Sequence, residues 1–135
     1  MKLLQLGSMR WRVLAVYDHR EDCHVLDVLV ALGANCPAAG KMLRRLRSVI
    51  PEHGPNFEND QKAKHLDDGI CEFKEQPQRG PKPRVFFFAD GQTFICTEAL
   101  AKRGDELSNF IARAKAIRET YFADKAARKL EIEVN

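Results

Sequence analysis

Basic residues bracket an apolar centre in the stretch 66–104, and these side chains are the ones most able to do chemistry. They are Lys74, Lys82, Arg84, Lys102 and Arg103. Arginine is well suited to an anion, because its planar guanidinium carries a permanent charge and binds oxygens in pairs. The pattern therefore permits an anionic partner, although a net charge of +3 does not require one.

Three consecutive strands must position these cations, and we predict them over 70–75, 84–89 and 93–99. Asp90-Gly91 is a two-residue hairpin signal, because such a turn needs positive φ angles. The run Val85-Phe86-Phe87-Phe88 favours a strand that is covered on both faces. The central strand is therefore expected in the middle of a sheet, with 76–83 as an exposed loop.

A turn centred on Asp90-Gly91 also predicts a register, in which Phe87 faces Phe94 and Arg84 faces Thr97. Because side chains alternate across a strand, the register divides the hairpin into two faces. One face holds Val85, Phe87, Phe94 and Cys96, and the other holds Arg84, Phe86, Phe88, Ile95 and Thr97.

The rest of the chain predicts one strand and three helices. A strand is expected over 10–18. Apolar residues at helical spacing indicate helices over 23–33 and 37–50, which form an αα-hairpin. Pro51 and Gly54-Pro55 are expected to end the second helix. The segment 56–66 is expected to be a connector, and a final helix covers about 106–122. The predicted order is β-α-α-β-β-β-α.

Composition places the chain among single-domain proteins without a membrane span. No apolar run approaches the roughly 20 residues of a membrane helix, and Met1–Met9 lacks the features of a signal peptide. We expect one domain over 1–135, with 1–9 as a leader and 124–135 as a tail that need not be ordered. Four widely spaced cysteines indicate free thiols in a reducing cytoplasm, and we expect no metal and no cofactor.

Several segments carry a family resemblance: a strand that begins near Trp11, two helices, and then LDDGICEFK (66–74), RVFFF (84–88) and AKRG (101–104) before a last helix. In order and spacing this resembles the RelE/ParE superfamily of bacterial toxins, most closely its phage-derived, HigB-like branch. The resemblance covers about Trp11 to Phe122. It implies an α+β, RelE-like domain with a mainly antiparallel twisted sheet of about four strands, an N-terminal αα-hairpin and a C-terminal helix.

The resemblance implies a toxin of a type II toxin–antitoxin system. Such a toxin is a cytoplasmic, ribosome-associated endoribonuclease that cleaves mRNA without metal, by attack of a ribose 2′-hydroxyl on the adjacent phosphate. A helix-turn-helix antitoxin neutralises it. By this resemblance the catalytic residues are Arg84, Arg103 and Lys74, and the residues that bind RNA phosphates are Lys102, Lys82 and Arg113. The general base is unassigned, because Glu72 and Tyr121 are both weak candidates.

Other interpretations stay open. Arg84 could pair with Glu98, Lys74 could be an ordinary exposed strand residue, and the cluster of Arg44, Arg45 and Arg47 is typical of a solvated helix face. Two functional alternatives are a non-catalytic binding protein that kept the fold and a ParE-like inhibitor of a topoisomerase.

Overall fold

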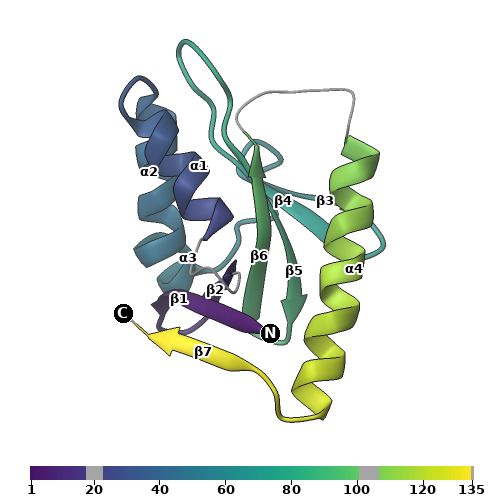
Figure 1. Cartoon of the computed structure of the whole chain (residues 1–135). Coiled ribbons are helices and arrows are strands. Elements are labelled where there is room, and N and C mark those ends of the chain that lie inside the picture. Colours follow the sequence, from purple (N-terminus) through teal and green to yellow (C-terminus); the bar gives the residue numbers. More distant parts are fainter. Residues whose placement is uncertain (18–22, 101–106, 135) are drawn as a thin grey trace.

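The computed structural model describes residues 1–17, 23–100 and 107–134 (Figure 1). Its strands are β1 Lys2–Ser8, β2 Arg12–Tyr17, β3 Ala63–Asp67, β4 Ile70–Lys74, β5 Arg84–Asp90, β6 Thr93–Leu100 and β7 Glu131–Val134. They form one mixed sheet in the order β3-β4-β5-β6-β2-β1-β7. The helical segments are α1 His24–Gly33, α2 Pro37–Arg44, the π-helical η1 Arg45–Val49, α3 Ile50–His53 and α4 Leu107–Ala126.

The predicted α+β class is confirmed, whereas the predicted count of about four strands is wrong: the described residues form seven. The additional strands are β1, β3 and β7, which lie in the expected leader, connector and tail. Each is stabilised by pairing with a neighbour rather than by its own pattern. β1 pairs antiparallel with β2 and parallel with β7, and β3 pairs antiparallel with β4.

Helices cover both faces of the sheet. The αα-hairpin lies on one face and α4 on the other (Figure 1). Val25, Leu29, Met42 and Leu46 of the hairpin pack on Val13, Phe73, Val85, Phe87 and Cys96 of the strands. On the opposite face, Ala114 and Tyr121 of α4 pack against Leu3, Leu14, Ile70, Phe88 and Ile95. No helix in the described residues combines the length and apolar composition that a membrane span needs.

The predicted faces of the central hairpin are confirmed, but its register is wrong by two residues. Asp90 pairs with Thr93 and Phe87 with Cys96, so the turn is centred on Gly91-Gln92 rather than on Asp90-Gly91. A shift of two residues keeps every side chain on its face, because the period of a strand is two. A bulge between Phe86 and Phe87 then moves Arg84 opposite Leu100.

The second helix of the hairpin continues through Pro51, one of the two signals expected to end it, and stops at the other, Gly54, which has a φ of 89°. Pro51 has no N–H to donate, but it lies at the start of α3, directly after the wider turns of η1.

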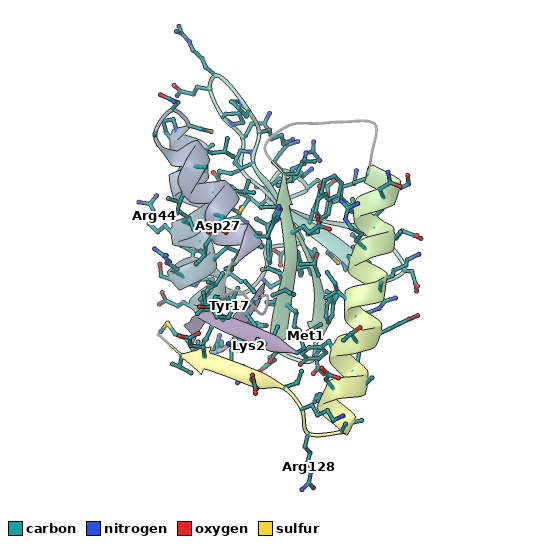
Figure 2. The ribbon with its side chains drawn as sticks, viewed as in Figure 1. Met1, Lys2, Tyr17, Asp27, Arg44 and Arg128 are labelled. Atoms are coloured by element: carbon teal, nitrogen blue, oxygen red, sulfur yellow. The ribbon has the colours of Figure 1, made fainter. Side chains whose placement is uncertain are left out.

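Strands β1 and β2 lie next to each other, and Lys2 Nζ of β1 is 5.5 Å from the ring centre of Tyr17 of β2 (Figure 2).

Candidate functional site

The sheet register brings two of the predicted catalytic residues together. Lys74, the last residue of β4, pairs with Arg84, the first residue of β5. The residues next to them in sequence, Phe73 and Val85, belong to the core under the αα-hairpin. Because successive side chains of a strand point to opposite faces, Lys74 and Arg84 point to the face that α4 covers. Glu72 and Glu98 lie one step further along the same face, on either side of Phe86. We call Glu72, Lys74, Arg84, Glu98 and Arg113 the charge cluster.

Arg84 is held by Glu72 in an almost buried ion pair. Its Nη1 lies 3.0 Å from both carboxylate oxygens, and the side chains are 11% and 2% exposed. Its buried Nε finds no hydrogen-bond partner within the part of the chain that the structure describes. The sequence left pairing with Glu98 open; the structure selects Glu72 instead, so Arg84 already has a counter-ion.

Lys74 differs from Arg84, because its charge has no counter-ion among the described residues. The residue is only 7% exposed, which corrects the interpretation of Lys74 as an ordinary exposed strand residue. Its backbone is fixed from both sides: its N–H donates to the Lys62 carbonyl at 2.9 Å, and its own carbonyl accepts from Arg45 Nη1 at 2.6 Å. The residue as a whole is nearly buried, but its Nζ is not among the fully buried, unpartnered polar atoms of the described residues, so an anion can reach an ammonium that no described carboxylate pairs with.

Arg113 of α4 forms the rim of the charge cluster. Its guanidinium pairs with Glu98 at 2.8 Å and lies 4.6 Å from the ring centre of Phe110. Phe110 in turn stacks on Phe86 at 5.1 Å, which fixes the start of α4 over the sheet. The structure therefore places the predicted phosphate-binding Arg113 at the same end of the sheet as Lys74 and Arg84.

The other predicted cations fall into two groups. Lys82 is half-buried in the loop that joins β4 to β5, two residues before Arg84. Lys102 and Arg103 lie outside the described residues; the described chain reaches Leu100, which pairs with Arg84, before it enters that segment.

Tyr121 is not part of the charge cluster. Its hydroxyl donates to Asp90 at 2.8 Å. Asp90 is the last residue of β5, at the far end of that strand from Arg84, and Lys125 also binds it. Burial and the hydrogen bond to Asp90 raise the pKa of Tyr121. Burial alone would raise the pKa of Asp90, but the bonds from Lys125 and Tyr121 lower it overall. Tyr121 is thus a core residue that closes the hairpin.

The charge cluster supplies positive charge but no free base within the described residues. Glu72 is bound by Arg84, and Glu98 is bound by Arg113. Sequence reasoning considered Glu72 as a base and missed its role as a counter-ion. The available signal was strand alternation. Glu72 and Lys74 are two residues apart on one strand and so share a face, and Arg84 lies opposite Lys74 on the next strand.

Comparison with known proteins adds no relative. A scan against protein-family models found no match, and searches of curated proteins and of solved structures also found none. The site geometry is therefore the basis on which a function can be argued for this chain.

Proposed function

We propose that the charge cluster binds the phosphate backbone of RNA and that the protein is a metal-independent endoribonuclease of the toxin–antitoxin kind. The observation that carries this proposal is Lys74, a nearly buried cation without a counter-ion in the described residues, beside Arg84 on the next strand. The order β2-α1-α2-β4-β5-β6-α4 supports a RelE-like core to which β1, β3 and β7 are added. Fold likeness alone does not specify activity, so the proposal depends on the cations.

In the proposed reaction, the ribose 2′ oxygen attacks the adjacent phosphorus and the bond to the 5′ oxygen breaks. The products are a 2′,3′-cyclic phosphate and a 5′-hydroxyl; the 2′ proton passes to a base and the 5′ oxygen takes up a proton. Negative charge grows on the phosphate oxygens in the transition state, where fixed cations are most effective. Lys74 provides the charge at the centre, and Arg84 and Arg103 bind the phosphate beside it. Lys82, Lys102 and Arg113 bind neighbouring phosphates.

A reconstituted translation reaction with primer extension on the mRNA tests this proposal. We expect the wild-type protein to produce discrete cleavage sites, and Lys74→Met to lower the cleavage rate at least about tenfold, because methionine keeps the packing volume and removes the charge. Lys129→Met, an exposed lysine after α4, is the matched control and should cleave like the wild type. Intact mRNA at saturating wild-type protein would refute the enzymatic proposal.

A second candidate is a non-catalytic binding protein with the same fold, including a ParE-like inhibitor of a topoisomerase. The observation that favours it is that both carboxylates of the charge cluster are engaged by arginines. This candidate predicts growth arrest, or inhibition of DNA supercoiling by gyrase, that survives Lys74→Met and occurs without cleaved mRNA. The ribonuclease candidate predicts that Lys74→Met weakens arrest and cleavage together; Arg84→Ala is less suitable, because it leaves the buried Glu72 without its counter-ion.

In either case we propose a cytoplasmic protein whose partner is a small helix-turn-helix antitoxin. For the ribonuclease, the further partners are mRNA and the ribosome. Co-expression with the product of the neighbouring reading frame, followed by co-purification, tests the antitoxin directly.

A further inference from the structure

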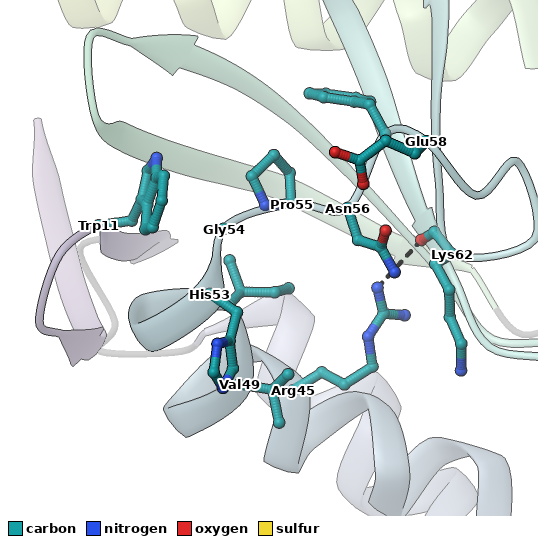
Figure 3. Close-up of a pocket in the computed structure, with 11 residues that line it drawn as sticks. Trp11, Arg45, Val49, His53, Gly54, Pro55, Asn56, Glu58 and Lys62 are labelled. Carbon is teal, nitrogen blue, oxygen red and sulfur yellow. Dashed lines mark hydrogen bonds between the residues drawn. The ribbon is translucent and has the colours of Figure 1, made fainter.

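A cavity of about 670 Å³ lies on the other side of the sheet from the charge cluster, where the αα-hairpin ends and the chain turns towards β3 (Figure 3). Lys74 and Glu75 are consecutive residues, so their side chains point to opposite faces. Glu75 therefore lies on the cavity side, where it binds Arg45 and Lys62. The volume is in the range of sites that hold small molecules.

Positive charge exceeds negative charge at the inner end of this cavity. Arg45 Nη1 is 3.2 Å and Lys62 Nζ is 2.8 Å from the oxygens of Glu75. One carboxylate is thus shared by two cations, and among the described residues no second carboxylate lies within 4 Å of either; Glu58 lines the cavity further along. The Lys62 side chain is 35% exposed, so a ligand in the cavity can reach its ammonium.

Arg45 keeps hydrogen-bonding capacity towards the cavity. Its contacts with described residues are Nη1 to the Lys74 carbonyl and to Glu75, and Nη2 to the Lys62 carbonyl. A guanidinium carries five N–H groups, so these bonds leave donors at Nε and Nη2. The prediction that Arg44, Arg45 and Arg47 form a solvated helix face is wrong for Arg45, which is buried. Arg44 projects away from the sheet (Figure 2).

The opposite end of the cavity is apolar and rigid. The Trp11 backbone N–H donates to the Pro51 carbonyl at 3.0 Å, and the indole packs on Gly54, where an added Cβ would lie 3.1 Å from the ring. Phe57 is fixed by stacking on His65, with ring centres 4.1 Å apart. Aromatic walls of this kind accept the flat face of a nucleobase.

Polar side chains line the cavity between these two ends. Asn56 and Glu58 stand over it, with Asn56 nearest to Arg45 and Lys62 (Figure 3). Asn56 has a φ of 63°, a left-handed conformation that places its side chain at the turn. An amide and a carboxylate can accept hydrogen bonds from the N–H groups on the edge of a base.

We propose that this cavity binds one nucleotide, with its base against Trp11 and its phosphate at Arg45 and Lys62. The nucleotide is either free or an unpaired unit of single-stranded RNA. A neighbouring hollow of about 340 Å³, lined by Arg10 and Glu52, shares His53 with the cavity and provides room for an adjacent unit. An acidic peptide is less suited, because it brings carboxylates to Glu58 and Glu52 and has no flat ring for Trp11.

Trp11 is the only tryptophan in the chain, so its fluorescence reports on this cavity. Titration with adenosine monophosphate and with a 2′-O-methyl oligoadenylate, which cannot undergo 2′-hydroxyl attack, should quench it saturably. Quenching by both indicates a mononucleotide site, and quenching by the oligomer alone indicates a strand site; each supports the proposal. Lys74→Met should keep the quench, which separates this site from the charge cluster.

Matched variants complete the experiment. Lys62→Ala should weaken binding about tenfold, because it removes a charged hydrogen bond, and Lys129→Ala should leave binding unchanged. Glu58→Ala, an exposed position that does not endanger folding, should weaken binding about threefold. The proposal is overturned by the absence of saturable quenching, by equal effects of Lys62→Ala and Lys129→Ala, or by quenching with polyglutamate and not with either nucleotide ligand.

Discussion

Arg84 and Glu72 show how burial decides the role of a charged residue. In water the two side chains would each be solvated, but here their exposed fractions are 11% and 2%. A buried ion pair contributes little net stability, because desolvation offsets the attraction, yet loss of one partner leaves an uncompensated charge. Glu72 thus holds the Arg84 guanidinium at a fixed position beside Lys74.

Replacement of Glu72 by glutamine should destabilise the fold by about 3–5 kcal/mol, because Arg84 would stay buried without a counter-ion. Urea unfolding followed by circular dichroism measures this change. Glu119→Gln, at an exposed position on α4, should stay within about 0.5 kcal/mol of the wild type. A loss below about 1 kcal/mol for Glu72→Gln would mean that Arg84 finds water or another partner, contrary to the buried pair described above.

At the scale of elements, β1 is fixed by a close approach to the helical segment η1. A Cβ added to Gly7 would lie 2.4 Å from the Arg47 carbonyl oxygen and 2.7 Å from the Pro51 ring. The register of β1 also shifts between Gln5 and Gly7, at this same point. Glycine is therefore required for the strand to pass η1, and Pro51 of the adjoining α3 is part of the same contact.

Gly7→Ala should accordingly destabilise the protein by about 1–3 kcal/mol, because the backbone must move to admit the methyl group. Gly40→Ala is the matched substitution: Gly40 lies inside α2 with no atom within 4 Å of the added Cβ, so it should stabilise by up to about 1 kcal/mol. Thermal unfolding of both variants tests the pair. Equal effects of the two substitutions would contradict the close approach.

For the whole molecule, segments from the two ends of the chain complete one edge of the sheet. β7 follows α4 and pairs parallel with β1, so it lies at the edge next to the N-terminal strand (Figure 1). Ile132 of β7 packs against the core under α4, whereas Val134 of the same strand is 65% exposed. This contact links the end of α4 to the β7 edge of the sheet, which lies at the other end of the strand order from β4.

Ile132→Asp should therefore lower stability by about 1–3 kcal/mol and increase amide hydrogen exchange in β1, since β7 would lose its apolar anchor. Val134→Asp introduces the same charge on the same strand at an exposed position and should leave both measurements near the wild type. Exchange in β1 that is unchanged by Ile132→Asp would show that β7 does not protect this edge.

The sequence by itself determined β2, the αα-hairpin, the strands β4, β5 and β6, the two faces of the β5–β6 hairpin, and α4. Their apolar residues repeat with the period of a helix or a strand, and such patterns are local. The predicted faces of Phe87 and Phe94 are correct although the predicted register is not, because an error of two residues leaves each side chain on the same face of its strand.

Only the tertiary structure decided the rest. β1, β3 and β7 are short. β1 and β7 depend on pairing with each other across the length of the chain, so no local pattern revealed them. The turn Asp68-Gly69 before β4 does carry an Asp-Gly hairpin signal, but the polar residues ahead of it lack strand periodicity, so β3 was missed. The choice of Glu72 over Glu98 as the partner of Arg84, and the inward position of Arg45, depend on which side chains burial brings together. Local periodicity thus determines the strongly patterned elements, while long-range pairing adds the short strands and desolvation decides which charges meet.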